Sequence, residues 1–443
     1  MNRRRAAVAG LLVSALLVVP ACSTADNGKH AAGGITAANK KDVTLSLRHT
    51  QIKETSKTRL AILEDVVMKT EEENLGLTFK LEGIDEIVNR DQKLKMEMAV
   101  GNPPDIFEVF GGADLNLYVK AGRMLDLTPI IEELGIRDKF VSLDEFTIDG
   151  KVYGLPFGGY SEAVFYNKRL FTQLNLSPPA TWDELIKLAD TLKEKGYTPF
   201  ALAAKDGWVS GMMWNTIMER YVGIDAMNKL LTGEAKWTDP GFVKGFAAYA
   251  DIANRGYFTP EALVLPYSDQ GAEFLSGKAA MVFTGTWDVN GFTGEEAKGL
   301  IGQIGYFPFP SIEGGAGDQT SINASYSNGY GFSSNLDADQ IEGVKKFIKN
   351  FYTEEVQKRT LFEDKLQPSM KLSDLSGVDP LTSEVLTVMA NASSSWKAYD
   401  AIVQPSVGAE INFGLQELIG KVSTPEKVAA KIQAKQRKAN EAQ

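Results

Sequence analysis

The sequence predicts an α/β protein with more than one domain. Between residues 43 and 110, segments with strand patterning alternate with segments of helical spacing, which is typical of a parallel sheet with helices packed on it. The chain has 443 residues. After a leader and a linker, about 400 remain, which exceeds what one hydrophobic core usually supports, so we expect two domains.

The first elements follow one another in regular order. Residues 43–48 (VTLSLR) alternate apolar and polar side chains, as a half-buried strand does. Residues 60–70 carry apolar side chains at helical spacing, and 77–82 form the next strand. A second helix is expected over 92–100, ended by Gly101, and a third strand over 105–110.

Local signals mark several later elements. Thr181 and Glu184 form a capping box that starts a helix, which should stop at Gly196. Residues 279–283 are an apolar strand, and Pro425 after a threonine predicts a helix start. The Asp-Ala-Asp run at 337–339 lacks the rest of a calcium-loop pattern and is therefore expected to begin a helix.

The beginning of the chain has the order of a secretory signal. Three arginines precede an apolar run over residues 6–19, and Cys22 follows directly. The run has about 14 residues, whereas spanning a bilayer takes roughly 20. The segment around Cys22 resembles the bacterial lipobox, although Pro20 and Val19 depart from its usual pattern. This resemblance implies a signal peptide over 1–21, a lipid (palmitate) on Cys22, and a flexible tether over 22–41. The alternative is a signal peptide cut nearby that leaves a free thiol.

Composition excludes several classes of function. The formal charge is −10, and loss of the three leader arginines makes it about −13, which gives no electrostatic basis for binding nucleic acid. Cys22 is the one cysteine, so the remaining chain has no disulfide and no thiolate nucleophile. We expect neither a cofactor nor a metal.

Two segments suggest crossings between the domains. Residues 154–159 (GLPFGG) follow an Asp-Gly turn, and residues 314–331 are rich in Gly, Ser and Asn. A discontinuous pair of domains with a cleft between them accounts for both segments.

A family resemblance is carried by motifs that occur in order along the chain. The motifs are NPPDI at 102–106, GKVYGLP at 150–156, VFYNK at 164–168, PPATWDE at 178–184, FLSGKAAM at 274–281, GTW at 285–287 and GYGF at 329–332. Together they resemble extracellular solute-binding proteins of the maltose-binding type, which serve ABC transporters.

This resemblance implies a fold and a function. The fold is a two-lobe, hinged α/β periplasmic-binding-protein fold of type II with the ligand cleft between its lobes. The expected N-terminal lobe is 42–154 with 325–366, and the expected C-terminal lobe is 155–324 with 367–443. The expected function is a monomeric, membrane-anchored receptor on the outer face of the cell membrane. It captures a neutral oligosaccharide by lobe closure and delivers it to an ABC permease.

Candidate ligand-binding residues include several aromatic side chains, because flat rings suit the C–H faces of sugars. By resemblance, Trp287 takes the position of a stacking tryptophan, with Asp288 beside it as a hydroxyl partner or a cap. Trp208, in a loop leading into a helix, is a second aromatic candidate. Tyr160 and Trp396 also match regions that contact sugar in the family.

Other candidates come from the ends of the predicted strands. Ligands of open α/β sheets bind beyond the carboxyl ends of the strands. This rule selects Arg48 and His49 after the first strand, and Glu108, Phe110 and Gly111 at the third. Arg48 and Glu108 are expected either to bind sugar hydroxyls or to pair with each other.

Two other classes of function remain as alternatives. A secreted glycosidase needs two suitably spaced carboxylates, which this chain has in number. However, its histidines are His30 and His49 alone, and it lacks the nucleophile-elbow, HExxH and phosphate-loop motifs. The other alternative is a surface protein that binds peptides or a cell-wall fragment.

Overall fold

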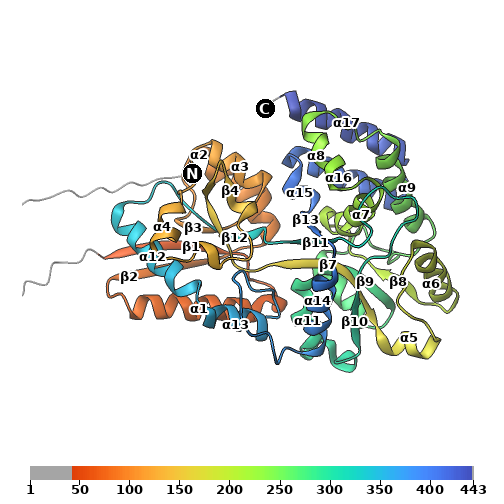
Figure 1. The fold of residues 1–443 in the computed structure, drawn as a ribbon, viewed down its shortest axis with the longest axis horizontal. Coiled ribbons are helices and arrows are strands. Elements are labelled where there is room, and N and C mark those ends of the chain that lie inside the picture. Colours follow the sequence, from red (N-terminus) through yellow and green to blue (C-terminus); the bar gives the residue numbers. More distant parts are fainter. Residues whose placement is uncertain (1–41, 442–443) are drawn as a thin grey trace, which may run out of the picture. The chain divides into compact units, whose positions relative to one another are not determined.

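The structure, a computed structural model, describes residues 42–441, which fold into two α/β lobes, each built on its own sheet (Figure 1). We call the part on the five-stranded sheet the first lobe and the part on the six-stranded sheet the second lobe. The predicted signal peptide, Cys22 and the tether lie outside the described residues. No helix among residues 42–441 is both long and apolar enough to cross a membrane.

The sheet of the first lobe begins with the predicted parallel strands. Strands β1 and β2 pair in parallel, and β1 also pairs in parallel with β3. Strand β12 returns from the second lobe and runs antiparallel to β3, which makes the sheet mixed. In spatial order the strands are β2 (Leu77–Gly83), β1 (Val43–His49), β3 (Ile106–Phe110), β12 (Asn328–Phe332) and β6 (Gly154–Pro156).

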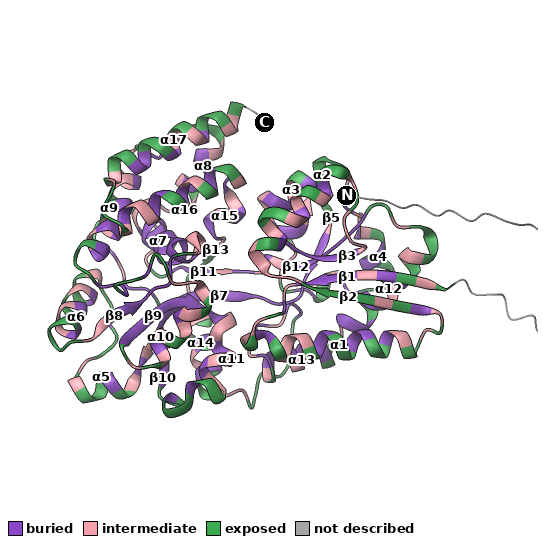
Figure 2. Ribbon diagram, turned by 180° about the vertical axis from the view of Figure 1, so that it is seen from behind, coloured by how far each residue is buried: buried purple, intermediate pink, exposed green. Residues whose placement is uncertain are grey.

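Helices cover this first sheet, and their buried faces complete its core. Leu63 and Val66 of α1 and Phe347 of α12 pack in one cluster with Leu45 of β1. Figure 2 shows buried and exposed stretches alternating along α1. The helices are α1 (Lys57–Glu72), α2 (Leu94–Val100), α3 (Ala113–Lys120), α4 (Thr128–Glu133), α12 (Ala338–Phe351) and α13 (Glu354–Phe362). Asp337 caps α12 through a capping box, which confirms that the Asp-Ala-Asp run begins a helix.

The second predicted helix differs from its expected form. Residues Val88–Lys93 are π-helical, and α2 continues from Leu94. Wide turns of this kind occur frequently at functional sites. Here the segment carries Asn89 and Arg90, both of which line the cavity described below.

The second lobe is centred on β7, which pairs antiparallel with β9, β10 and β11. Its strands are β7 (Tyr160–Asn167), β8 (Thr198–Ala201), β9 (Ala279–Gly285), β10 (Ile304–Phe307), β11 (Ile322–Ser325) and β13 (Ser395–Trp396). Its longer helices are α6 (Trp182–Glu194), α7 (Gly207–Val222), α8 (Ile224–Thr232), α9 (Pro240–Asn254), α14 (Pro380–Asn391), α16 (Pro405–Ile419) and α17 (Pro425–Glu441). The shorter helices are α5 (Lys168–Leu174), α10 (Gln270–Leu275), α11 (Val289–Thr293) and α15 (Tyr399–Ile402).

The local signals of this lobe hold in the structure. Thr181 and Glu184 form the predicted capping box of α6, and Pro425 is the first residue of α17. The helix α7 begins at Gly207, so Trp208 lies in its first turn rather than in a preceding loop.

The chain passes from one sheet to the other at three places among the described residues. Strand β6 leads directly to β7, and β11 leads to β12. The latter crossing is shorter than the Gly-rich stretch suggested, since Gly315 and Gly317 lie against the backbone of α7 in the second lobe. The third passage lies between α13 and α14, where Gln367 forms a bridge with Gly159.

Candidate functional site

A cavity of about 640 Å³ is lined by residues of both lobes. The first lobe contributes Arg59, Asn89, Arg90 and Glu108, among others. The second lobe contributes aromatic side chains, carboxyl groups and side-chain amides. A cavity of this size, with apolar walls and a few placed polar groups, is typical of a small-molecule site.

Three aromatic residues of the second lobe form one wall of this cavity. The ring centroids of Trp208 and Tyr267 lie 4.7 Å apart, and those of Trp208 and Trp287 lie 6.3 Å apart. Trp208 comes from the start of α7, and Trp287 comes from the 3₁₀ turn after β9. Both are only partly buried, so their rings retain accessible area. We call Trp208, Tyr267 and Trp287 the aromatic wall.

Hydrogen bonds hold the aromatic wall in place. The indole N–H of Trp287 donates to the hydroxyl of Tyr267, which donates to Oδ2 of Asp288 over 2.8 Å. The same carboxyl oxygen accepts from Thr284 over 2.8 Å. Burial raises the pKa of Asp288 and of Tyr267. Tyr160 of β7 packs edge-on against Trp287 with centroids 5.1 Å apart.

Carboxyl and amide groups line other parts of the cavity. Glu108 of β3 accepts hydrogen bonds from Thr50 and from Gln51, and burial raises its pKa. Glu162 of β7 accepts a hydrogen bond from Asn323 over 2.7 Å, and burial raises its pKa to about 8. Groups of this kind can bind sugar hydroxyls with fixed geometry.

Arg90 links the two lobes beside these groups. Its Nε donates to Asp114 of the first lobe over 2.8 Å, and its Nη1 donates to Asp400 of the second lobe over 3.1 Å. The guanidinium also lies 3.9 Å from the centroid of the Phe110 ring. One face of Phe110 is therefore covered by Arg90 and is closed to a ligand.

Six of the ten predicted ligand-binding residues line the cavity. They are Glu108, Phe110, Tyr160, Trp208, Trp287 and Asp288. The other four, Arg48, His49, Gly111 and Trp396, are not among its lining residues.

Arg48 and His49 are engaged within the first lobe. Arg48 is buried and pairs with Glu82 and with Glu97, so the expected pairing with Glu108 does not form. His49 is buried, and its Nδ1 accepts a hydrogen bond from the backbone of Gln51. Burial lowers the pKa of His49, which favours the neutral imidazole.

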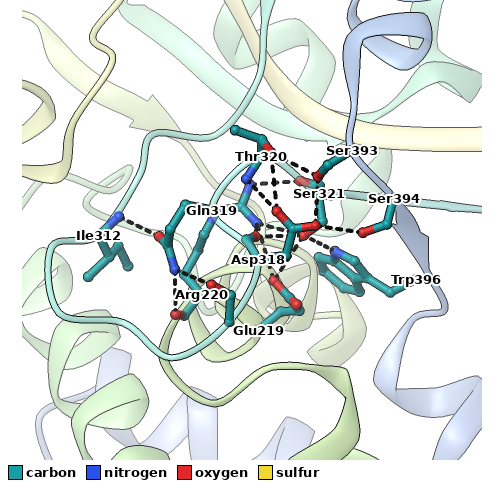
Figure 3. Close-up of polar contacts among 11 residues, drawn as sticks. Glu219, Arg220, Ile312, Asp318, Gln319, Thr320, Ser321, Ser393, Ser394 and Trp396 are labelled. Carbon is teal, nitrogen blue, oxygen red and sulfur yellow. Dashed lines mark hydrogen bonds and ion pairs between the residues drawn. The ribbon is translucent and has the colours of Figure 1, made fainter.

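Gly111 and Trp396 have structural contacts. The backbone of Gly111 approaches that of Glu145 so closely that a Cβ would lie 2.7 Å from its carbonyl oxygen. Trp396 is 5% exposed and donates its indole N–H to Ser321 (Figure 3). Ser321 also accepts from Arg220 over 2.9 Å, which makes Trp396 part of a buried polar network.

The structure also brings together residues that the sequence did not single out. These are Arg90, Asp114 and Asp400, together with Tyr267, Glu162 and Asn323. The sequence could have indicated Glu162, because this charged residue directly precedes the apolar segment Ala-Val-Phe of a strand, and a buried charge is rare without a function or a partner. Arg90 and Asp400 are 310 positions apart, and no local pattern connects them.

The fold and the cavity define a class of protein. The sequence model of the bacterial extracellular solute-binding proteins matches residues 54–358, and the chain belongs to this family. The chain shares the two-lobe α/β periplasmic-binding-protein fold with solved structures of binding proteins. Within residues 42–441, no group of three or more His, Cys, Asp or Glu side chains is arranged to hold a metal ion.

Individual relatives are similar over most or part of the chain. The structure of a chitin oligosaccharide binding protein is 44% identical and covers 90% of this chain and 99% of its own, with a TM-score of 0.85. A structure from a study of xylan utilization by Caldanaerobius polysaccharolyticus is 28% identical, covers 89% of this chain and 100% of its own, and has a TM-score of 0.82. The multiple sugar-binding protein of Streptococcus mutans is 26% identical over 263 residues, which are 58% of this chain and 61% of that protein. The chain spans about half to three fifths of the length of such curated relatives.

Proposed function

We propose that this protein is the extracellular carbohydrate receptor of an ABC importer. It captures a neutral oligosaccharide of two or more units and releases it unchanged to the permease. The observation that carries the proposal is the cavity itself, in which an aromatic wall accompanies fixed carboxyl and amide groups contributed by both lobes. The 44% identity to a chitin oligosaccharide binding protein makes chitin fragments the first saccharides to test.

The proposed binding mode follows from the chemistry of sugars. A pyranose ring has apolar C–H faces, which stack on aromatic rings, and equatorial hydroxyls, which need polar partners. We place one sugar ring against Trp208 and Trp287, with Tyr160 and Asp288 beside it. Glu108 accepts hydrogen bonds from sugar hydroxyls on the side of the first lobe. Phe110 contacts the sugar with the edge of its ring, which Arg90 does not cover.

Lobe closure completes the site in this proposal. The first lobe, built on the five-stranded sheet, moves as one body, and the second lobe, built on the six-stranded sheet, moves as the other. The whole of β6 moves with the first lobe and the whole of β11 with the second, so the boundaries lie within residues 157–159 and 326–327 rather than at 154/155 and 324/325. Arg90 and Asp400 are a contact that forms only when the lobes approach each other. Closure then presents a surface for the permease, and the lipid on Cys22 keeps the monomeric receptor at the outer face of the membrane.

Binding without cleavage is part of the proposal. A glycosidase needs one carboxyl group as a proton donor and a second that is free to act on the sugar or on water. Both oxygens of Glu108 accept hydrogen bonds from protein side chains, and Oδ2 of Asp288 accepts two. These bonds hold Glu108 and Asp288 as hydrogen-bonding partners and leave neither free to act as the second carboxyl group, which favours a receptor over a hydrolase.

A thermal-shift screen tests this function. A ligand that binds only the folded protein raises its free energy of unfolding by RT ln(1 + [L]/Kd), so a saturating saccharide should raise the melting temperature by several degrees. The panel contains chitin, xylan and maltose oligosaccharides of two to four units, with the monosaccharides. Glycerol at equal concentration controls for general stabilisation by polyols. If no saccharide exceeds the glycerol control, the proposal fails.

A further inference from the structure

Glu162 occupies an unusual place in the cavity. It lies on β7, where its register partners are Gly285 on β9 and Asn323 on β11. The residue is 5% exposed and lines the cavity. Its Oε2 accepts the hydrogen bond from Asn323, which leaves Oε1 without a protein donor among the described residues.

No cation neutralises this carboxyl group. Within residues 42–441, Glu162 forms no ion pair, and the nearby Arg90 is engaged by Asp114 and Asp400. The groups that interact electrostatically with Glu162, or with its neighbour Tyr160, are mostly acids and phenols. These groups are Asp400 and Tyr399 on α15, Glu145 on the first lobe, Tyr160 on β7 and Tyr306 on β10. The cations in the surroundings act on other acids: Arg90 acts on Asp400, and Lys397 acts on Glu145.

An unpaired carboxylate in such a place is strongly disfavoured. Burial penalises the charged form, and the Asp400 carboxyl adds repulsion. The hydrogen bond from Asn323 acts in the opposite direction but is weaker, and the pKa of Glu162 is raised to about 8. At neutral pH the side chain is therefore a carboxylic acid, with one O–H donor and one acceptor oxygen.

We propose that Glu162 meets the saccharide as a neutral acid, whose Oε1 hydroxyl donates a hydrogen bond to an uncharged oxygen of the sugar. This inference rests on the proposed function and names a residue that selects for an uncharged saccharide. A hydroxyl or the carbonyl of an acetamido group accepts such a bond. A uronic acid is disfavoured beside Glu162, because its carboxylate would lie near Asp400, which lines the same cavity.

The proposal makes binding depend on pH in a defined direction. Once Glu162 loses its proton, Oε1 changes from donor to acceptor and faces the sugar oxygen with an unfavourable charge. Affinity should therefore be constant below pH 7 and should fall about tenfold per pH unit above pH 8. Glutamine has the same shape, and its Nε2 donates at every pH while its Oε1 accepts from Asn323.

Calorimetric titration of the full chain with N,N′-diacetylchitobiose from pH 6 to pH 10 tests this. The wild type should lose roughly 100-fold in affinity at pH 10 relative to pH 7. The variant E162Q should stay within about threefold of the wild type at pH 7 and should keep that affinity to pH 10. The matched control is E363Q, which makes the same change at Glu363, an exposed residue of the first lobe. This variant should follow the wild-type profile.

A measurement without ligand gives an independent readout. The folded protein keeps the Glu162 proton up to about pH 8, whereas the unfolded chain releases it near the ordinary value of 4.5. Stability therefore falls as pH rises between these two values, because the unfolded state binds fewer protons. E162Q lacks this term, so its melting temperature should exceed that of the wild type by a margin that grows from pH 5 to pH 8.

Three results would overturn the inference. One is a wild-type affinity that does not change between pH 7 and pH 10. Another is a loss of more than tenfold in E162Q at pH 7, which would mean that the sugar requires a carboxylate. The third is a wild-type protein that does not bind diacetylchitobiose at any pH. If another saccharide of the thermal-shift panel binds, this inference alone fails. If none binds, the proposed function fails as well.

Discussion

The hydrogen bond between Arg90 and Asp400 joins the two lobes, so its removal should weaken lobe closure by a measurable amount. Arg90 lies on the π-helical segment of the first lobe, and Asp400 lies on α15 of the second. The variant D400N keeps the shape of the residue and removes its charge. Arg90 retains its partner Asp114, so no buried cation is left alone.

The magnitude follows from the geometry of this pair. The bond is 3.1 Å long, and the two side chains are 26% and 22% exposed. A hydrogen bond to a charged group contributes about 1.5–3 kcal/mol, and partial exposure lowers this through solvent screening. We expect D400N to weaken closure by about 1–2 kcal/mol, which corresponds to a roughly 5- to 30-fold loss of affinity.

The assay is calorimetric titration with the saccharide found by the thermal-shift screen, at pH 6.5, which lies below the pKa of about 8 of Glu162 in the wild type. The control is D65N, which makes the same chemical change in a 2.9 Å ion pair with Arg359, between two helices of the first lobe. D65N should leave affinity unchanged, and the D400N effect should shrink at high salt. If D400N binds as tightly as D65N, the contact does not contribute to closure.

Two further substitutions test the site and its support. W287A removes a ring of the aromatic wall and should weaken saccharide binding by about 1–3 kcal/mol in a calorimetric titration. The control W182A, at the start of α6, should lower only the melting temperature. An affinity of W287A within twofold of the wild type would show that the sugar is placed wrongly. R220M leaves the buried side chain of Glu219 without its cationic partner and removes hydrogen bonds to Ser321. It should therefore lower the free energy of unfolding by about 3–5 kcal/mol in chemical denaturation. The surface variant R437M should change this free energy by no more than about 0.5 kcal/mol. A small effect of R220M would mean that the network in Figure 3 does not hold the loop before β11.

Much of the fold was accessible from sequence because its determinants are local. Alternating side chains gave the first three strands, and the capping residues Thr181 and Asp337 marked two helix starts. Composition indicated two of the three crossings among the described residues, although the Gly-rich stretch at 314–331 is longer than the crossing itself. The π-helical form of residues 88–93 was not predicted, because nothing in the local pattern distinguishes it from a regular helix.

The site was accessible only in part, for a physical reason. The family resemblance selects Trp287 and Trp208, and the rule on strand ends selects Glu108. The same rule also selects Arg48, as a ligand contact or as a partner of Glu108. Neither alternative holds, because the carboxylates of Glu82 and Glu97 bind Arg48 within the first lobe. Long-range pairs such as Arg90 with Asp400 depend on how the lobes meet, which a single sequence does not display.

In the proposed function, a saccharide is retained between the lobes and leaves chemically unchanged. Equilibrium dialysis of diacetylchitobiose against the protein, quantified by mass spectrometry, tests retention and integrity in one measurement. We expect one equivalent of sugar to be enriched on the protein side, with its disaccharide mass intact after release. Equal concentrations on both sides, or the appearance of the monosaccharide mass, would contradict it.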